Sequence, residues 1–508
     1  MSTPSFILAL DHGTTSIRAC LMDREGRIVS TGQQPVEQIY PRPDWVEHDA
    51  NQLWHATLVV CEKALAEHGA TWRDVAAIGL TNQRETVVLW DRESGKPVAN
   101  AIVWQCRRTS PACAQLRKEG HAAMIQVKTG LVIDPYFSAT KLQWLLREHS
   151  SAAIKAMQGK LAFGTVDTWI SWNLSGRQLH VTDVTNASRT MLFNIHTRQW
   201  DDELLALFEV PGSLLPEVHP SQGVLGNTDP AVTDGVAVPI AALCGDQQAA
   251  LFGQKCWQPG LAKSTYGTGA FLMMTTGREP VQSRRGLLTT LAPGLNGLPV
   301  YAMEGAVFIA GAALEWLQHK LHCFDDISQV DALATSIADN RGVYFVPAFT
   351  GLGAPYWDAA ARGVLCGLTQ DTGKAHLVRA ALEAMVFQTK EVLDVMEAES
   401  GVRLACLRVD GGVTRSRFLM QMMANVLNIP VARSADAELT AKGAGYLAGL
   451  AVGFWKNADA LAALPEQWET FEPDPTFTET ERQRLLGEWQ AAVKLALTRP
   501  ELVQSLVS

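Results

Sequence analysis

The sequence predicts an α/β protein made of two lobes that share one design. Short apolar runs typical of buried strands alternate with longer stretches typical of helices. The chain also contains two hairpins of the same kind, in which apolar strands flank a turn rich in glycine and threonine. They read "FILALDHGTTSIRACLMD" near the start and "LAKSTYGTGAFLMMTTG" near the middle. This repetition suggests a duplicated architecture with a cleft between the two halves.

The first half begins with apolar runs separated by short turns over residues 6–34, which predicts a three-stranded antiparallel meander. A helix is expected from Asn51 to about His68. The runs "AAIGLTNQ" and "TVVLWD" are then expected to be strands. The half ends with "PIAALCGDQQAALFG", where a strand leads through Asp246 into a helix.

The second half follows its own hairpin with long helical stretches such as "AHLVRAALEAMVFQTKEVLDVME". A strand, a loop and a helix are expected in "LRVDGGVTRSRFLMQMMANVL". The boundary between the halves is expected between Gly253 and Gly260. We therefore predict an N-terminal domain at residues 1–253 and a C-terminal domain at residues 254–508.

Composition excludes several classes of protein. The 508 residues carry a formal net charge of -9, which gives no electrostatic reason to expect nucleic acid or an anionic membrane as a partner. The nine cysteines are scattered without a CxxC pair, so reduced thiols are favoured over disulfides or a zinc site. No signal peptide is apparent, and no uncharged apolar run approaches the ~20 residues of a membrane helix. A cytoplasmic protein is expected.

The turn of the opening hairpin has the chemistry of a phosphate loop. In "DHGTTS", glycine permits close approach of the backbone, and consecutive N–H groups with threonine hydroxyls can bind an anion. Asp11, at the strand end, could hold Mg²⁺, which prefers one or two carboxylates together with phosphate oxygens. The alternative is an ordinary hairpin turn, in which the same residue types are also favoured.

Three other glycine-rich turns point in the same direction. They are Gly267-Thr268-Gly269 in the second hairpin, "VDGG" at 409–412, and the helix start "IAGAALEW" at 309–316. Each could line a nucleotide. The alternative is an ordinary hairpin turn for the first segment and close packing against a neighbouring helix for the other two. Together with the opening hairpin they make a nucleotide site more probable than any one of them does.

Asp246 ends a strand and precedes the helix "QQAALFG". Open α/β sheets place their ligands at the ends of strands, so this carboxylate could accept the proton of an attacking hydroxyl during phosphoryl transfer. The alternative role is that of a helix N-cap, which is common for aspartate.

Polar and aromatic residues in three further stretches suggest a small pocket. Arg84 and Glu85 lie between two strands and could recognise hydroxyl groups or simply pair with each other. Trp104 and Tyr136 could wall a ligand or belong to the core. Apolar walls with an acid, an arginine and a phenol would suit a polyol.

Together these motifs resemble the glycerol kinases of the FGGY carbohydrate kinase family. The likeness runs from about Phe6 to beyond Trp455 and includes "DHGTTSIRA", "TNQRET", "AIVWQCRRT", "TGLVIDPYFSATK", "GDQQAALFGQ", "YGTGAF" and "VPAFTGLGAPYWD". The resemblance implies two ribonuclease H-like domains of the actin and Hsp70-type ATPase superfold, with ATP in the interdomain cleft. It also implies Mg²⁺-dependent phosphorylation of glycerol by ATP to sn-glycerol 3-phosphate, with release of ADP, as the first step of glycerol catabolism.

The resemblance assigns roles to individual residues. Asp246 is implied to be the general base and to bind glycerol. The other residues implied to contact glycerol are Arg84, Glu85, Trp104, Tyr136, Gln247 and Phe271. Those implied to bind the nucleotide are Thr14, Thr15, Ser16, Arg18, Thr268, Gly311, Glu315, Gly412 and Ser416. Asp11 is implied to serve the metal, and a homodimer or homotetramer is the implied assembly.

The chain departs from the family pattern at a few positions. His12 stands where glutamine is usual, and Glu315 and Ser416 stand where many relatives have Gln and Asn. Ala237 replaces an arginine that some bacterial relatives use to bind fructose 1,6-bisphosphate, so weak or absent inhibition by this sugar phosphate is expected. Two alternatives stay open: an FGGY kinase for another polyol or sugar, and a chaperone or cytoskeletal ATPase with the same type of hairpin.

Overall fold

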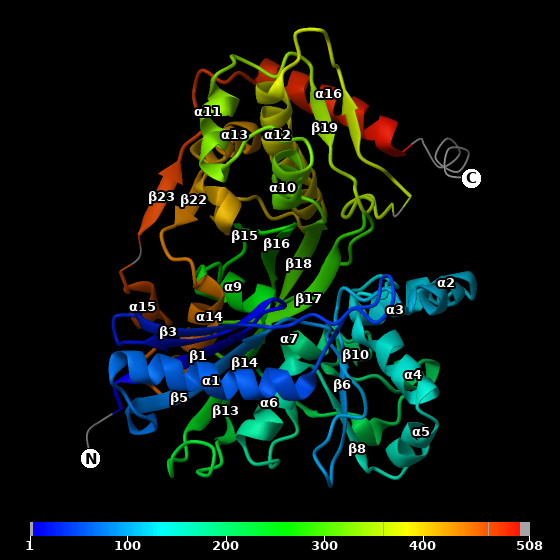
Figure 1. Cartoon of the computed structure of the whole chain (residues 1–508), viewed down its shortest axis with the longest axis vertical. Helices are drawn as coiled ribbons and strands as arrows, with labels where there is room; N and C mark the ends of the chain where they lie inside the picture. Colours follow the sequence, from blue (N-terminus) through cyan, green and yellow to red (C-terminus); the bar gives the residue numbers. More distant parts are fainter. Residues whose placement is uncertain (1–3, 359, 466, 498–508) are drawn as a thin grey trace.

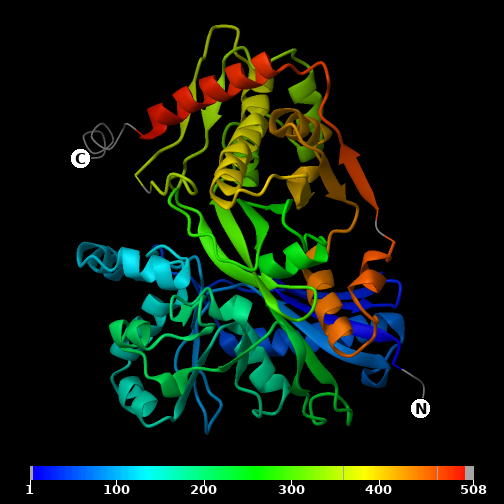
Figure 2. The ribbon, with the colours of Figure 1, turned by 180° about the vertical axis from the view of Figure 1, so that it is seen from behind.

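The computed structural model describes residues 4–358, 360–465 and 467–497. These residues form two lobes, each built on one large mixed sheet (Figure 1). The first lobe is the lower one in Figure 1, and the second lobe lies above it. Seen from behind, the chain passes between them through the green strands and the short helix that follow the first sheet (Figure 2).

The first sheet has six strands in the order β13-β14-β5-β1-β2-β3. The predicted meander is confirmed, because β1 pairs with β2 and β2 with β3, both antiparallel. The strands β5 and β14 extend the sheet parallel to β1. The strand bounds are β1 Phe6–His12, β2 Ser16–Met22, β3 Ile28–Pro35, β5 Val75–Asn82, β13 Gln222–Asn227 and β14 Pro239–Gly245.

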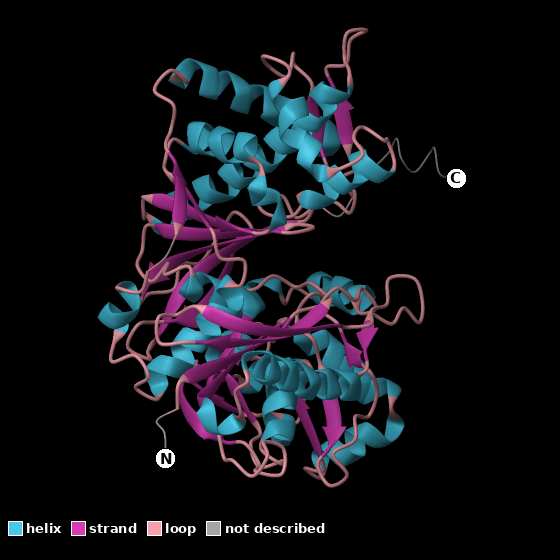
Figure 3. Cartoon of the chain, turned by 60° about the vertical axis from the view of Figure 1, so that its left-hand side comes forward, coloured by secondary structure: helices cyan, strands magenta, loops and turns pink. Residues whose placement is uncertain are grey.

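The second sheet repeats this arrangement. Its order is β17-β18-β16-β15-β21-β22-β23, so β18, β16, β15, β21 and β22 take the places of β3, β2, β1, β5 and β14, with the same directions. The predicted duplication is therefore visible in the topology (Figure 3). The strand bounds are β15 Leu261–Tyr266, β16 Ala270–Gly277, β17 Leu288–Pro293, β18 Pro299–Val307, β21 Cys406–Asp410, β22 Val431–Ser434 and β23 Trp468–Phe471.

Alternation along the strands distributes side chains to the two faces of the first sheet. Leu8 and Leu10 join the core beneath helices α1 (Ala50–His68) and α6 (Val166–Leu174). Ile7 and Ala9 join a second core on the opposite face. That second core receives α9 (Asp246–Gly253) and α14 (Leu439–Ala451).

Helix α14 comes late in the chain but packs on the first sheet, against β1, β5 and β14. Two glycines let it cross α9 closely. A Cβ atom at Gly443 would lie 1.9 Å from the Ala249 carbonyl oxygen, and one at Gly253 would lie 2.0 Å from that of Leu439. The second lobe thus returns a helix to the first lobe, next to the helix that Asp246 begins.

Smaller elements complete the two lobes. Helices of the second lobe pack against its sheet and against one another, with the long helix α12 among them. None of the helices in the described ranges has both the length and the apolar character that a membrane crossing requires. The remaining helices are α2 Ser110–Lys118, α3 Ala122–Thr129, α4 Ser138–Glu148, α5 Ser150–Met157, α7 Val184–Ala187, α8 Asp202–Leu207, α10 Gly311–His319, α11 Val330–Thr335, α12 Lys374–Ser400, α13 Arg417–Leu427, α15 Ala458–Ala462 and α16 Glu479–Leu497. The remaining strands are β4 Glu47–His48, β6 Val88–Asp91, β7 Ala101–Ile102, β8 Leu161–Gly164, β9 Val181–Asp183, β10 Phe193–Asn194, β11 Gln199–Trp200, β12 Glu217–His219, β19 Tyr344–Val346 and β20 Val364–Cys366.

Candidate active site

Asp246 occupies the junction of the two lobes. Strand β14 ends at Gly245, which takes the N-cap position, and Asp246 is the first residue of α9. The Oδ1 atom of Asp246 accepts a hydrogen bond from the N–H of Gln247 at 2.7 Å. Its side chain is 28% exposed, so the carboxylate sits at the positive end of a helix and still reaches solvent. Asp246 is therefore not the N-cap, and its carboxylate can meet a substrate.

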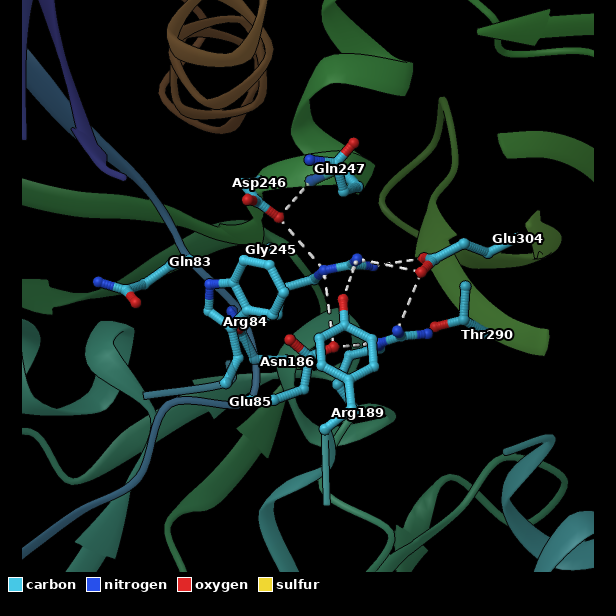
Figure 4. A network of polar contacts seen from close by, with 12 residues as sticks. Gln83, Arg84, Glu85, Asn186, Arg189, Gly245, Asp246, Gln247, Thr290 and Glu304 are labelled. Atoms are coloured by element: carbon cyan, nitrogen blue, oxygen red, sulfur yellow. Dashed lines mark hydrogen bonds and ion pairs between the residues drawn. The ribbon is translucent and has the colours of Figure 1, made fainter. Parts of the chain in front are cut away.

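A buried arginine lies beside this carboxylate (Figure 4). The Nε atom of Arg84 is 3.2 Å from Oδ1 of Asp246. The other end of the guanidinium donates to both carboxylate oxygens of Glu304, Nη1 at 2.5 Å and Nη2 at 3.1 Å. It also donates to the side-chain oxygens of Gln248 and Tyr136, at 3.1 and 3.2 Å. Arg84 is thus held from several sides.

A second buried arginine, Arg189, joins the same network. Its Nε donates to Glu85 Oε1 at 2.6 Å, and its Nη2 donates to Glu304 Oε1 at 3.0 Å. Glu85 also lies 3.8 Å from Nε of Arg84. The ion pair between Arg84 and Glu85, one of the two alternatives considered for these residues, therefore exists as part of a four-residue network. The network buries two positive and two negative charges.

Burial and ion pairing shift the pKa values of Glu85 and Glu304 in opposite directions. Burial raises the pKa of Glu85, although Arg84 and Arg189 oppose this. Burial also disfavours ionised Glu304, but the two guanidinium groups outweigh it and hold its pKa at about 2. Glu304 is therefore an anion at neutral pH, and it keeps both arginines paired.

Aromatic side chains from both lobes stand next to this network. The ring of Trp104 lies 5.5 Å from that of Tyr136 and 6.4 Å from that of Phe271, both in edge-to-face contact. Phe271 comes from β16 of the second lobe, whereas Trp104 and Tyr136 come from loops of the first. The structure thus brings together the predicted apolar wall and the predicted polar groups.

The opening hairpin reaches the same region. Nε1 of Trp104 donates to Oγ1 of Thr14 at 2.9 Å, so the aromatic wall contacts the turn of the hairpin. Thr14 and Ser16 are half-buried, and Thr15 is exposed. The hairpin turn is therefore partly open to solvent next to the aromatic wall.

Asp11 is the second-last residue of β1 and lies beside Arg18, with Nη1 of Arg18 3.9 Å from Oδ2 of Asp11. Burial raises the pKa of Asp11 to about 7; Arg18 opposes this shift, whereas Asp246 adds to it. The two aspartates are therefore close enough to sense each other's charge. Arg18 also donates to Glu438, just before α14.

His12, the departure from the family pattern in this turn, points elsewhere. Its Nε2 lies 2.8 Å from Oγ1 of Thr57 on helix α1, and its ring is fully buried. Burial lowers the pKa of His12 to about 3, so the ring is neutral. The side chain of His12 packs beneath the sheet, so this departure from the family pattern does not change the exposed surface of the turn.

The glycine-rich turns of the second lobe also meet one another. The N–H groups of Ala310 and Gly311 donate to the carbonyl oxygens of Thr268 and Gly267, at 2.8 and 3.0 Å. A Cβ atom at Gly311 would lie 3.0 Å from a methyl group of Val413, which follows Gly412. Thr268 and Gly412 are exposed. Three separate glycine-rich segments thus form one open surface.

Glu315 and Ser416 are less directly tied to that surface. Glu315 is exposed on α10, one helical turn beyond Gly311. Ser416 is the N-cap of α13, where its hydroxyl accepts from the Leu419 N–H at 3.0 Å and donates to Asp331. The observed role of Ser416 is helix capping. A contact of either residue with a nucleotide stays a prediction.

Sequence reasoning missed several charged residues of the site. Glu304 and Lys263 interrupt apolar strands, and a lone charge in a buried strand is the signal that could have revealed them. Lys263 donates to the side chains of Gln247 and Thr265, and burial lowers its pKa to about 8. Arg189 and Lys141 are equally buried, but their surroundings in the sequence gave no such signal.

Comparison with known proteins adds the family. Residues 6–253 match the N-terminal domain of the FGGY family of carbohydrate kinases, and residues 262–452 match its C-terminal domain. The chain is 51% identical to glycerol kinase 2 of Thermotoga maritima over 492 residues, which cover 97% of this chain and 99% of that protein. It is 50% identical to the glycerol kinase of Klebsiella pneumoniae, with 99% of each chain covered.

Solved structures agree with the sequence matches. The crystal structure of Plasmodium falciparum glycerol kinase with ADP superposes with a TM-score of 0.91 at 35% identity, covering 97% of this chain and 98% of that one. A xylulose kinase of Lactobacillus acidophilus has the same fold, with a TM-score of 0.88 at 21% identity, covering 97% and 99% of the two chains.

Proposed function

This chain belongs to the FGGY family of carbohydrate kinases, and we propose that it transfers the terminal phosphoryl group of ATP to a terminal hydroxyl of glycerol. The products are sn-glycerol 3-phosphate and ADP, as in the first step of glycerol catabolism. One observation carries the proposal: the half-exposed carboxylate of Asp246 lies 3.2 Å from a buried arginine, at the junction of both lobes. The aromatic rings of Trp104, Tyr136 and Phe271 contact one another next to the buried network of charges.

In this reaction Asp246 is the general base. As the glycerol oxygen attacks the γ-phosphorus, its proton passes to the carboxylate, and the bond to the β–γ bridging oxygen breaks to release ADP. Phosphoryl transfer needs mainly positioning and neutralisation of charge. The hydroxyls of glycerol would be held by Arg84, Glu85, Tyr136 and Gln247. Trp104 and Phe271 would cover its carbon chain.

The nucleotide would bridge the two lobes. We assign its phosphates to Thr14, Thr15, Ser16 and Arg18 of the opening hairpin. The rest of the nucleotide would lie on the glycine surface that includes Thr268, Gly311 and Gly412, with Glu315 and Ser416 as further proposed contacts. The exposed Gly412 supports this assignment, because backbone without a side chain permits close approach of a ligand.

The residues present fit a magnesium ion. Mg²⁺ usually binds one or two carboxylates together with phosphate oxygens. Among the described residues no group of three or more His, Cys, Asp or Glu side chains could hold a metal alone. Asp11, buried at the strand end and neighboured by Asp246, is the carboxylate that would hold the ion. When bound, the ion would neutralise charge on the phosphates.

Three further assignments accompany the proposal. The division into residues 1–253 and 254–508 is supported by the two repeated sheets. A cytoplasmic location is supported by the nine cysteines, all free thiols within the described ranges. Assembly as a homodimer or homotetramer rests on the family resemblance, and sedimentation of the purified chain would test it.

The proposed function can be tested with a panel of substrates. The purified protein is incubated with Mg²⁺ and ATP, and ADP release is measured with three- to six-carbon polyols and with xylulose. We expect steep dependence on glycerol and much weaker turnover with the larger substrates. A preference for another polyol or sugar would replace glycerol as the substrate. ADP release that depends on added peptide, or on protein concentration alone, would contradict the kinase assignment.

A further inference from the structure

Four of the five N–H donors of the Arg84 guanidinium make hydrogen bonds, Nη1 to Gln248 and Glu304 and Nη2 to Tyr136 and Glu304. The remaining nitrogen, Nε, forms an ion pair with Asp246 at 3.2 Å. Since guanidinium donors are fixed in one plane, these four hydrogen bonds leave the group little freedom to rotate. The position of the guanidinium beside Asp246 is therefore set by its partners at the opposite end.

Glu304 is the partner that fixes this position most firmly. It lies in β18 of the second lobe, is completely buried, and binds both Nη atoms in the bidentate manner that gives guanidinium pairs their geometric specificity. Arg84 follows β5 of the first lobe. The pair therefore connects the two lobes at the point where the proposed general base stands.

Glu304 is in turn held in place by Arg189. Nη2 of Arg189 donates to the same Oε1 atom that Arg84 contacts, and its Nε donates to Glu85. The charged groups that face Glu304 are Arg84, Arg189, Glu85 and Lys263. Within the described part of the chain, Arg84 and Arg189 are the residues that form ion pairs with it. Removing its charge would leave two buried guanidinium groups to share Glu85 and Asp246.

We propose that Glu304 is a positioning residue for phosphoryl transfer, which acts through Arg84 to hold the Asp246 carboxylate and the hydroxyl-binding side chains in place. The inference rests on the proposed function, and it names a residue from the second lobe as a determinant of the glycerol site in the first. Because Glu304 acts through another residue, its contribution must depend on the presence of Arg84.

A double-mutant cycle tests this dependence. Glu304→Gln keeps the shape and removes the charge. We expect kcat/KM for glycerol to fall about 10- to 100-fold, the range for a displaced catalytic group, while KM for ATP changes less than about twofold. In an Arg84→Ala background, the same substitution should change kcat/KM by less than about threefold. Losses that multiply in the double variant would overturn the proposal.

A second variant covers the possibility that Glu304→Gln folds poorly. Glu304→Asp keeps the charge but is one methylene shorter, so it cannot reach both Nη atoms in the same way. We expect a folded protein with an intermediate loss in kcat/KM for glycerol and an unchanged KM for ATP. Wild-type kinetics in either variant would refute the proposal, as would an equal rise in both KM values.

The matched control is Glu383→Gln. Glu383 is also a buried carboxylate paired with an arginine, with Arg379 Nε donating to it at 2.8 Å, but it lies on α12 away from the site. This variant should lose stability and keep wild-type kinetics. If the wild-type protein itself shows no turnover of glycerol, the proposed function fails. If only the variants of Glu304 deviate from expectation, the inference fails and the function stands.

Discussion

The Nε atom of Arg84 and the Oδ1 atom of Asp246 are 3.2 Å apart, so a fully buried cation adjoins the carboxylate that we assign as general base. Arg84 is 2% exposed and Asp246 is 28% exposed. The arginine is therefore fixed within the protein, while the aspartate remains open to a substrate. This asymmetry lets one contact orient the base without covering it.

Replacing the base should abolish turnover but leave binding of glycerol largely intact. Asp246→Asn keeps the size and polarity of the side chain and removes its capacity to take up a proton. We expect kcat to fall by about 10²- to 10⁴-fold, the usual contribution of general base catalysis. Glycerol affinity, measured by calorimetry, should change only slightly. Turnover close to that of the wild type would exclude Asp246 from this role.

Lys141 should matter for glycerol but not for ATP. Its buried ammonium donates to the carbonyl oxygens of Tyr136 at 2.6 Å and of Glu85 at 3.3 Å. Glu85 has a left-handed backbone with φ of 61°, which costs energy for this residue type and needs such support. Lys141→Met should raise KM for glycerol about tenfold, equivalent to about 1.4 kcal/mol, and leave KM for ATP unchanged.

Lys155→Met is the control for Lys141, because Lys155 is an exposed lysine of the same lobe whose ammonium group pairs with Asp91 at the surface. It should behave as the wild type in both KM measurements. A parallel rise in both KM values for Lys141→Met would instead indicate a general loss of structure.

A methyl group at Gly412 should interfere with ATP. A Cβ atom there meets no protein atom within 4 Å, and the residue lies on the glycine surface assigned to the nucleotide. Gly412→Ala should therefore leave the melting temperature unchanged and raise KM for ATP about tenfold, or about 1.4 kcal/mol. Gly373→Ala is the control, since its Cβ also meets open space but lies at the start of α12. Equal KM values for the two variants would contradict the assignment.

The stability of the protein should respond to Asp167 in a pH-dependent manner. Burial, with a contribution from Asp183, raises the pKa of Asp167 to about 7 from an ordinary 3.8. A carboxyl whose pKa is raised by folding binds a proton more tightly in the folded state, so its destabilising effect grows as pH rises from 3.8 toward 7. At higher pH the full penalty is present, roughly 4 kcal/mol at most.

Asp167→Asn removes this penalty, and the amide oxygen can still accept from Thr182, whose Oγ1 lies 2.6 Å from the carboxylate. We expect the variant to exceed the wild type in melting temperature by more at pH 8 than at pH 5. An identical difference at the two pH values would show that Asp167 does not titrate in this range.

Fructose 1,6-bisphosphate should have little or no effect on activity. The exposed Ala237 offers no cation, and the loop before β14 contains the carboxylates Asp229 and Asp234 but no lysine or arginine from residue 226 to 238. Two acids next to the site of a bisphosphate would repel it. Glycerol-dependent ADP release is measured over a range of the sugar phosphate. Clear inhibition at physiological concentrations would refute this expectation.

The local signals in the chain were sufficient for the architecture and for much of the site. Apolar runs separated by short turns predicted the meander over residues 6–34, and β1, β2 and β3 confirm it. The local sequence also predicted the strand that ends before Asp246, the helix after it and the three glycine-rich turns. Such features depend on neighbours within a few residues, so they can be predicted from the local sequence.

The partners of those residues depended on how the chain closes upon itself. Glu304 binds Arg84 across 220 positions, and Glu438 binds Arg18 across 420. Helix α14 crosses from the second half to cover the first sheet. The local sequence does not predict these long-range contacts. They form when two sheets and their helices bury their apolar faces and thereby bring the charged side chains together. The candidate site residues could therefore be proposed from the sequence, whereas their burial and pairing come from packing in three dimensions.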